Sequence, residues 1–226
     1  MNALELDAVT KEHPGSPPVV ALEDVTLAVT PGEFVAVTGP SGSGKSTLLA
    51  LAGTLERPSS GVIRLDGTAV EALSDRELSG VRAYGLGFVF QQYHLQPTRT
   101  VLQNVADGLL YRGVPLAERR AHAEEAVAAV GLAHRAEHRP GELSGGECQR
   151  TAIARAIVGD PALLLADEPT GSLDSGTGAE IFALLGSLNE RGTTVLVVTH
   201  NEELARSAAR AISLRDGRID RDKRRR

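Results

Sequence analysis

One short stretch limits what this chain can fold into more than any other part of the sequence. Glycines and a lysine recur at fixed spacing in Gly39-Pro40-Ser41-Gly42-Ser43-Gly44-Lys45-Ser46-Thr47. The apolar run 34–37 stands directly before this stretch, and the apolar run 48–51 follows it. We therefore expect a strand, a glycine-rich loop and the start of a helix, in an order that is typical of a loop holding phosphate groups.

The residue types in this loop suit a nucleoside triphosphate. Glycine lets the backbone curl closely enough for successive N–H groups to point at phosphate oxygens, and the following helix N-terminus favours negative charge. Lys45 is expected to neutralise the outer phosphates, and the Ser46 hydroxyl is expected to ligate Mg²⁺. The alternative is a merely flexible Gly/Ser loop. The predicted strand and helix on either side argue against it.

Composition narrows the class of protein. The 226 residues can bury a sizeable core as one domain, and the formal net charge of −5 argues against a general nucleic-acid binder. No apolar run approaches the roughly 20 residues that cross a bilayer, and no hydrophobic signal segment follows the N-terminus. We expect a cytoplasmic chain that reaches a membrane only through a partner. The single cysteine excludes an internal disulfide, and the histidines lack the spacing of a zinc finger.

The C-terminal segment 218–226 is rich in arginine and lysine. A frayed, solvated end is the simpler interpretation, and a patch for anionic lipid headgroups is the alternative. We expect the frayed end.

Apolar periodicity predicts an α/β fold. Short strands of an antiparallel flank, separated by Pro/Gly turns, are expected at 4–9, 25–29 and 61–65. Central strands of a parallel sheet, covered by helices on both faces, are expected at 86–90, 162–166 and 193–199. The predicted architecture is thus a mixed, mainly parallel sheet with an antiparallel β flank, and the glycine-rich loop 39–47 marks its core as a P-loop NTPase core.

A helical insertion separates the two sheet-forming parts of the chain. Helical spacing of apolar residues occurs at 100–111, 116–130 and 144–158. We therefore predict one domain over 1–226. Within it, 1–91 and 160–226 form the core with its β flank, and 92–159 form an α-helical subdomain.

A second motif is an apolar strand that ends in two acids, Asp167 and Glu168. Ligands of open parallel sheets bind beyond the carboxyl ends of the strands, so this pair is expected beside the phosphate loop. Asp167 is the predicted carboxylate on the metal side. Glu168 is placed to accept a proton from a water that attacks the terminal phosphorus. The alternative is a solvated Asp-Glu pair before the turn at Pro169.

A third motif, Leu143-Ser144-Gly145-Gly146-Glu147, stands where a helix is expected to start. Ser144 and Glu147 form a capping-box pattern. Consecutive glycines do not help a cap, because each costs about 1 kcal/mol in a helix relative to alanine. Bare backbone at a helix N-terminus instead offers a second anion site. A second copy of the chain could present this site to the triphosphate that the first copy holds.

Together these motifs resemble the ATP-binding subunit of an ABC transporter, over about residues 4–220. In that resemblance Walker A is 39–47, Walker B is 163–168 and the signature is 143–147. ATP and Mg²⁺ are the implied ligands. All residues of Walker A are expected at the phosphates, and Ser144 to Glu147 are expected at the ATP of a second subunit in a head-to-tail dimer.

Three further elements follow the family's order. The resemblance implies that Gln91, in the Q-loop 87–92, senses Mg²⁺ and the attacking water, and that Asp174, in the D-loop 172–174, lies at the nucleotide-containing interface. It implies that His200, in the switch motif, contacts the terminal phosphate. Taken alone, Gln91 is better explained as an ordinary strand-end amide, and His200 as a surface residue capping the helix that starts near Asn201. The order of the motifs favours the functional interpretation of both.

Two positions depart from the family's pattern. Relatives usually stack an aromatic side chain on adenine, and the nearest matching residue here is His13, whose imidazole offers a smaller face. His13 could instead be a plain loop residue. Cys148 follows the signature where relatives often have glutamine, and a buried, inert thiol is expected there.

The resemblance is strongest to the subgroup that serves lipoprotein-releasing and macrolide-exporting permeases. It implies a separate membrane permease as partner, a position on the inner face of the cell membrane, and export. A regulatory ATPase of a cell-envelope or division complex is the main alternative, and a soluble ABC protein of repair or translation is another. We expect the region 93–111 to contribute to the groove for the permease, with Tyr93, Leu95 and Leu102 as candidates.

Overall fold

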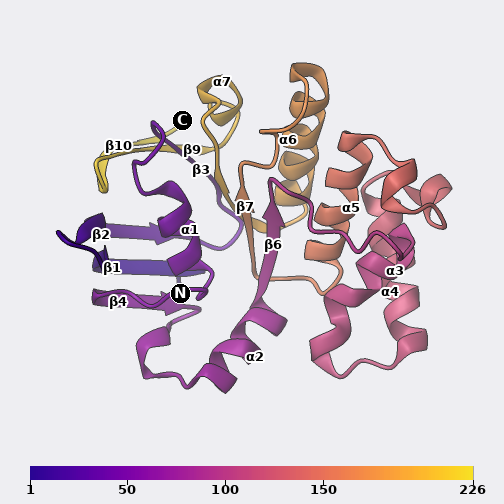
Figure 1. Ribbon diagram of the computed structural model, residues 1–226, viewed down its shortest axis with the longest axis horizontal. Helices are drawn as coiled ribbons and strands as arrows, with labels where there is room; N and C mark the ends of the chain where they lie inside the picture. Colours follow the sequence, from indigo (N-terminus) through magenta and orange to yellow (C-terminus); the bar gives the residue numbers. More distant parts are fainter. Residues whose placement is uncertain (226) are drawn as a thin grey trace.

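A six-stranded sheet runs through the centre of the computed structural model, which describes residues 1–225 (Figure 1). The order across the sheet is β10-β9-β3-β8-β7-β6. The strands are β3 (Phe34–Thr38), β6 (Leu86–Phe90), β7 (Leu163–Asp167), β8 (Thr194–Val198), β9 (Arg210–Arg215) and β10 (Arg218–Arg224). Every neighbouring pair is parallel except β9 with β10. The predicted mixed, mainly parallel sheet is therefore confirmed.

A second, antiparallel sheet of order β2-β1-β4-β5 flanks the first (left side of Figure 1). Its strands are β1 (Leu4–His13), β2 (Val19–Val29), β4 (Ser60–Leu65) and β5 (Thr68–Ala69). Both β1 and β2 are longer than predicted. Irregularities in the register of β1 with β2 interrupt the alternation of apolar and polar residues, and this alternation was the signal for these strands.

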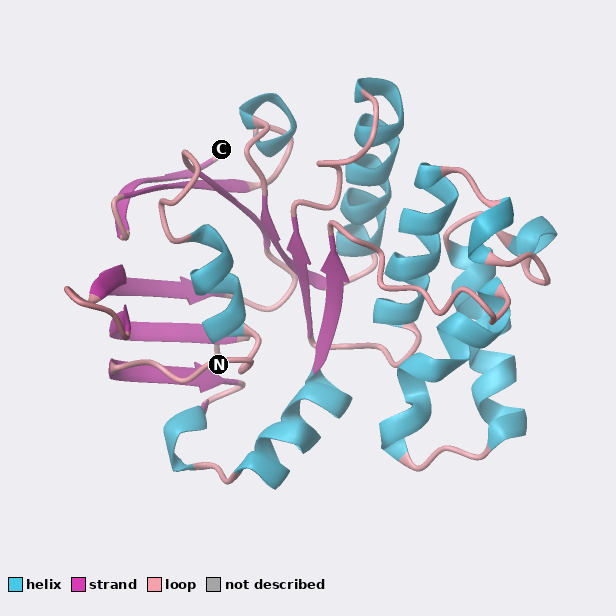
Figure 2. Ribbon diagram, viewed as in Figure 1, coloured by secondary structure: helices cyan, strands magenta, loops and turns pink. Residues whose placement is uncertain are grey.

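Helices cover both faces of the central sheet (Figure 2). The α-helices are α1 (Lys45–Ala52), α2 (Asp75–Gly85), α3 (Val101–Ala106), α4 (Leu116–Ala129), α5 (Gly145–Ile157), α6 (Ser175–Glu190) and α7 (Glu202–Ala205). The 3₁₀ helices are η1 (Val70–Ala72), η2 (Asp107–Arg112), η3 (Ala133–Arg135) and η4 (Pro140–Glu142). In residues 1–225, no helix combines the length and apolarity needed to cross a bilayer.

Helices α3, α4 and α5 pack together in the part of the chain between β6 and β7 (right side of Figure 2). Capping boxes start α3 and α5: Thr100 and Ser144 each bond the backbone N–H three residues on, and the residue there bonds back. The single helix expected over 100–111 is instead α3 followed by the tighter η2. Gly108, which has low helix propensity, lies just after this change.

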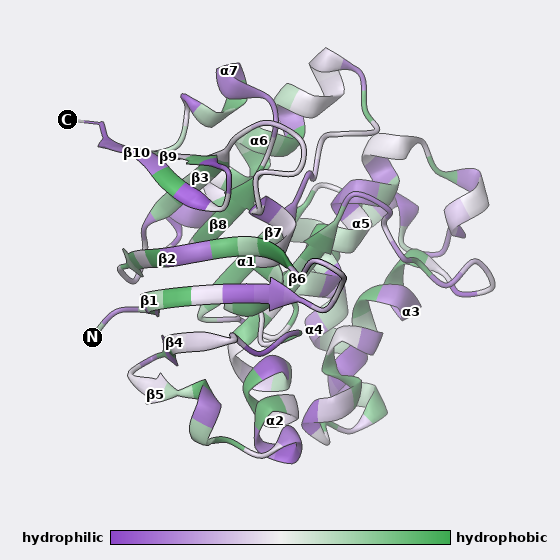
Figure 3. Ribbon diagram, turned by 60° about the vertical axis from the view of Figure 1, so that its left-hand side comes forward, coloured by the Kyte–Doolittle hydropathy of each residue, from purple (hydrophilic) through white to green (hydrophobic). Residues whose placement is uncertain are grey.

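The central sheet separates two apolar cores. Leu163 and Leu165 of β7 pack on one face with Leu48 of α1, whereas Leu164 and Ala166 face the core built with α3, α4, α5 and α6. Apolar colouring accordingly follows the central strands in Figure 3. Alternate strand residues point to opposite faces, so a strand buried on both faces is apolar at every position.

Strand register brings the motifs to one edge of the central sheet. Val37 of β3 pairs with Val198 of β8, Val198 pairs with Asp167 of β7, and Asp167 pairs with Phe90 of β6. These residues form one row at the carboxyl ends of four parallel strands. The motif residues that follow this row are Gly39 after β3, Gln91 after β6, Glu168 after β7 and His200 after β8.

The prediction of a frayed C-terminus is wrong for the described residues. β10 pairs with β9, and Arg225 N–H donates to the Ala209 carbonyl at 2.8 Å. The Arg210 side chain is only 7% exposed and contacts Asp222 Oδ2 at 2.6 Å and Glu33 Oε1 at 3.2 Å. This buried cation needs its acidic partners, and one of them lies on β10. Arg226 lies outside the described residues.

Candidate nucleotide-binding and hydrolysis site

The glycine-rich loop joins β3 to α1, and its lysine folds back over it. Lys45 Nζ donates to the carbonyl oxygens of Gly39 and Pro40, each at 2.9 Å. The residue is 9% exposed, so its charge lies within the curve of the loop. Phosphate oxygens are stronger partners for an ammonium group than neutral carbonyls are. These two bonds can therefore be exchanged for phosphate contacts when a nucleotide enters.

Helix α1 begins without a side-chain cap. Gly44 occupies the N-cap position with φ of 99° and offers no acceptor to the first turn. The free N–H groups of such a turn, together with the helix dipole, suit an anion. Ser46 and Thr47 belong to this turn, and Ser46 is exposed at its rim.

Neighbouring backbone holds the loop closely. A Cβ on Gly39 would collide with the Leu214 carbonyl of β9, and a Cβ on Gly44 would collide with the Ala21 carbonyl of β2. The Ser43 carbonyl accepts a hydrogen bond from Gly217 N–H at 3.2 Å. Pro40, Ser41 and Gly42 remain exposed on the outer side of the loop. Glycine is therefore required at positions 39 and 44 by close packing as well as by any phosphate contact.

Asp167 ends β7 with a buried oxygen that has no partner. Its Oδ1 makes no hydrogen bond within the described chain. Burial, followed by the negative charge of Glu168, raises the pKa of Asp167, while a hydrogen bond from Ser46 and the charge of Lys45 act in the opposite direction. An unpartnered buried carboxylate oxygen near a serine hydroxyl fits a hard cation such as Mg²⁺. Within residues 1–225, no cluster of three or more His, Cys, Asp or Glu side chains could hold a metal on its own.

Glu168 turns away from the strand direction. Its φ of 45° lies in the left-handed region, which is uncommon for a residue with a side chain. Its N–H still donates to Val198 O at 2.9 Å. Its Oε2 accepts from His200 N–H at 3.2 Å and lies 2.8 Å from His200 Nδ1. The Glu168 carboxylate is 17% exposed and the His200 imidazole is 68% exposed, so the imidazole lies between the carboxylate and the solvent.

Gln91 lies beside the loop that follows β7. Its carbonyl oxygen accepts from Ser172 Oγ at 3.2 Å. A Cβ on Gly171 would stand 2.8 Å from its Nε2 atom. The Gln91 side chain itself is exposed. The predicted Q-loop and D-loop residues are thus direct neighbours.

The predicted signature forms the first turn of α5. Glu147 N–H donates to Ser144 Oγ at 3.3 Å, and Ser144 N–H donates to Glu147 Oε2 at 2.8 Å. Ser144 and Gly145 are exposed, whereas Gly146 is buried against Thr177 of α6. Glu147 also pairs with Arg135 at 2.9 Å, and these bonds lower the pKa of Glu147, the Ser144 N–H contributing most. Gly146 therefore has a packing role that sequence reasoning did not foresee.

Asp174 caps the next helix. Its carboxylate accepts from Thr177 N–H at 3.0 Å and from Thr177 Oγ1 at 2.7 Å, and these bonds lower the pKa of Asp174. The residue thus fixes the start of α6, on the same threonine that touches Gly146. His13 lies at the end of β1, paired with Val19 of β2 and half-buried.

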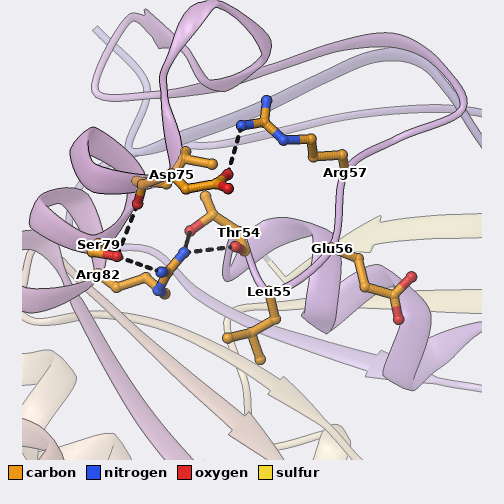
Figure 4. Close-up of a pocket in the computed structure, with 8 residues that line it drawn as sticks. Thr54, Leu55, Glu56, Arg57, Asp75, Ser79 and Arg82 are labelled. Atoms are coloured by element: carbon orange, nitrogen blue, oxygen red, sulfur yellow. Dashed lines mark hydrogen bonds and ion pairs between the residues drawn. The ribbon is translucent and has the colours of Figure 1, made fainter.

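A separate cleft of about 340 Å³ lies at the other end of α1 (Figure 4). Arg82 enters it and donates to the Thr54 carbonyl at 3.0 Å and to Ser79 Oγ at 2.9 Å, while Arg57 pairs with Asp75 at 3.1 Å. Both guanidinium groups already have partners, so this cleft does not supply an anion site.

One candidate for the permease groove is wrong. Leu102 is 4% exposed and belongs to the core between α3 and its neighbours, so a partner cannot reach it. Tyr93 and Leu95 are half-buried. The exposed large apolar residues in and just after this region are Leu110, Tyr111 and Leu116, with exposures of 49, 84 and 71%. Burial at Val101, Leu102, Val105 and Leu109 keeps a helical period through η2, and Leu110 and Tyr111 lie off this buried stripe. Cys148 is buried as expected, and burial raises its pKa.

The fold and this edge define an ATPase of the ABC class. The model of the ABC transporter family matches residues 22–171. The chain belongs to that family, and it is an ATP-binding, ATP-hydrolysing cassette. The predicted family, fold class and enzymatic activity are confirmed.

Curated relatives and solved structures agree. The chain is 48% identical to the Macrolide export ATP-binding/permease protein MacB 1/2 of Paracoccus denitrificans over 98% of its own length, but spans only 33% of that relative. It is 49% identical to the Lipoprotein-releasing system ATP-binding protein LolD of Geobacter metallireducens, over 96% of this chain and 97% of that protein. The dimeric, ADP- and Pi-bound post-hydrolysis structure of the ATP-binding cassette MJ0796 aligns with a TM-score of 0.90 at 43% identity, covering 99% of both chains.

Proposed function

We propose that two copies of this chain close head to tail around two ATP molecules, each held by the glycine-rich loop of one copy and the signature turn of the other. The observation that carries this proposal is the position of the two anion-binding helix starts. α1 packs into the core on one face of the central sheet, and α5 packs into the core on the other face. The signature turn of one chain is thus poorly placed to serve its own loop, while Ser144 and Gly145 are exposed to a second copy.

In this proposal each residue at the edge has a distinct role. Lys45 exchanges its bonds to Gly39 and Pro40 for phosphate oxygens, which places positive charge where the transition state gains negative charge. Glu168 orients the attacking water and accepts its proton. The His200 imidazole is close enough to Glu168 to orient its carboxylate, and the imidazole would turn to the terminal phosphate once ATP is bound.

Magnesium fits the donors at the same edge. Ser46 and Asp167 would hold it, with Gln91 nearby, and the bound ion would neutralise phosphate charge. The unpartnered Asp167 oxygen supports this assignment more than any other feature.

Closing and opening of the dimer would move a membrane permease that exports a lipoprotein, peptide or drug-like molecule. The names of the MacB and LolD relatives support this class of partner. The exposed apolar residues Leu110 and Tyr111 of η2 and Leu116 at the start of α4 are candidates for the permease contact. The cassette would then sit at the inner face of the cell membrane.

Glu168→Gln tests whether each ATP is held by a composite site, built from the glycine-rich loop of one copy and the signature turn of the other. This substitution removes the base and keeps the binding groups. Sedimentation velocity should show ATP-dependent dimers of this variant and monomers with ADP, and turnover should be lost. Persistent monomers at saturating ATP, or turnover at the wild-type rate, would contradict the proposal. Reconstitution of the wild-type chain with its permease then distinguishes export from a purely regulatory ATPase, which would show coupled hydrolysis without cargo movement.

A further inference from the structure

Arg155, near the end of α5, holds the backbone of the segment 91–94, which begins at Gln91. Its guanidinium donates to the carbonyl oxygens of Tyr93 at 2.8 Å and His94 at 2.6 Å. Burial lowers the pKa of Arg155, and nearby Asp107 raises it. A half-buried cation with two carbonyl acceptors makes strong, directional contacts. The segment is thereby attached to the helix that carries the signature turn.

The Tyr93 side chain packs against the other end of α5. A Cβ on Gly145 would lie 3.1 Å from the Tyr93 hydroxyl oxygen and 3.1 Å from Leu173 Cδ2. The hydroxyl therefore lies directly against the exposed signature turn, on the side where the D-loop residue Leu173 also packs. Side-chain contact at the first turn and backbone contact near the last turn leave the segment little freedom to move independently of α5.

The start of the segment is tied to the hydrolysis edge instead. Gln91 contacts Gly171 and accepts from Ser172 at 3.2 Å. His94, with φ of 49°, packs its ring edge-on against Phe90 of β6 at 5.4 Å. Four residues thus link the carboxyl end of β6 to both ends of α5.

We infer that Tyr93 and Arg155 are positioning residues that make Gln91 and the signature turn move as one unit when ATP binds. This inference rests on the proposed function, because the unit matters only if the signature acts on the ATP of a second copy. Loss of either residue would leave the nucleotide pocket of a single chain intact. It would also let the signature turn adopt orientations that do not match the partner's ATP.

The experiment adds Tyr93→Phe, Arg155→Met and Arg155→Lys to full-length Glu168→Gln, in which dimers accumulate. Tyr84→Phe is the matched control, because the hydroxyl of Tyr84, on α2, also contacts backbone and donates to the Arg112 carbonyl of η2 at 3.2 Å. Two quantities are measured for each variant: ATP affinity at protein concentrations too low for dimers, and the ATP concentration at half-maximal dimer formation by sedimentation velocity.

Arg155→Met should raise the ATP concentration at half-maximal dimer formation about tenfold, the scale of one or two charge-assisted hydrogen bonds. Tyr93→Phe should raise this concentration about threefold. Arg155→Lys should raise it less than Arg155→Met does, because an ammonium group still reaches one carbonyl. ATP affinity of the monomer should stay within about twofold throughout, as should both quantities for Tyr84→Phe.

Several results would overturn the inference. Dimer formation unchanged in both Tyr93→Phe and Arg155→Met would show that the segment does not position the signature. A parallel fall in monomer ATP affinity would indicate a general structural role. If Arg155→Met does not fold, Tyr93→Phe and Arg155→Lys decide the matter. Failure of the Glu168→Gln parent to form dimers would remove the proposed function and this inference together, whereas a parent that dimerises with unaffected variants removes this inference alone.

Discussion

Nδ1 of His200 lies 2.8 Å from Oε2 of Glu168, and the His200 N–H donates to the same oxygen at 3.2 Å. One carboxylate oxygen therefore lies against two nitrogen atoms of His200, just after β8, although the residues are 32 positions apart in the chain. The proposed base is oriented by a neighbouring strand before any nucleotide is present. The imidazole must exchange this contact if it is to reach the terminal phosphate.

His200→Ala should lower kcat much more than ATP affinity. Without the imidazole, Glu168 keeps only the backbone N–H of residue 200, so its orientation toward water becomes less defined. We expect kcat to fall by about 10²-fold, within the range for a positioned acid–base group. Single-turnover hydrolysis and an ATP-binding titration separate the two effects. A variant with unchanged kcat would show that this pairing has no part in turnover.

Gly146→Ala should weaken packing between α5 and α6. Its Cβ would stand 2.6 Å from Thr177 Cγ2, and overpacking of this kind costs about 1–3 kcal/mol, partly offset by the better helix propensity of alanine. Thr177→Ser removes that methyl group and keeps the hydroxyl that donates to Asp174 at 2.7 Å. Urea unfolding should therefore show the double variant to be more stable than Gly146→Ala.

Comparing Gly146→Ala with the double variant also distinguishes two possible reasons for the glycine at position 146. A Cβ at position 146 points at Thr177 of the same chain and not at the exposed side of the turn, so we expect the stabilised double variant to dimerise with ATP again. A double variant that is stable but stays monomeric with ATP would show that the signature turn needs the glycine for another reason. Full recovery of dimerisation would mean that packing alone requires the glycine. Thr177→Ser by itself is the control and should behave like the wild type in both assays.

Asp222→Asn should destabilise the C-terminal hairpin in a way that depends on pH. Hydrogen bonds from Arg210 lower the pKa of Asp222 below the ordinary value of 3.8. The ionised Asp222 carboxylate therefore stabilises the folded protein fully at pH values above 3.8. This stabilisation is lost as the pH falls through the depressed pKa. At pH 7 the variant should lose about 2 kcal/mol, less than for a fully buried pair because Asp222 is partly exposed.

Urea unfolding of wild type and Asp222→Asn between pH 7 and about pH 2 measures this difference. The gap between the two proteins should stay constant down to about pH 5 and narrow below about pH 4. A gap that persists unchanged in acid would show that the charge of Asp222 is not what stabilises β10.

The sequence was sufficient for the parts of the fold that local pattern determines. β6 was predicted with its observed bounds, because the run 86–90 has no polar side chain and lies between Gly85 and Gln91. The position of Asp167 and Glu168 beside the glycine-rich loop followed from the rule that ligands bind beyond the carboxyl ends of parallel strands, whereas His200 was expected from the family resemblance.

Features that depend on distant partners were not predictable. The charge-rich segment of β10 lacks apolar alternation and is a strand because it pairs with β9 and supplies Asp222 to the buried Arg210. Leu102 was expected at a surface and is buried, since α3 turns its apolar face inward. The contacts of Tyr93 with Gly145, and of Gly146 with Thr177, join segments far apart in the chain. No short-range pattern encodes them.

Mixing two inactive variants tests the composite site most directly. Lys45→Ala should weaken ATP binding by about 10- to 100-fold, because charge-assisted contacts to phosphate are lost, and Ser144→Arg should bind ATP as a monomer but not close. In a mixed dimer, the intact loop of the Ser144→Arg chain faces the intact signature of the Lys45→Ala chain. We predict that ATP hydrolysis, absent from each variant alone, returns on mixing and rises with protein concentration. A mixture that stays inactive at concentrations where wild-type dimers form would contradict the account.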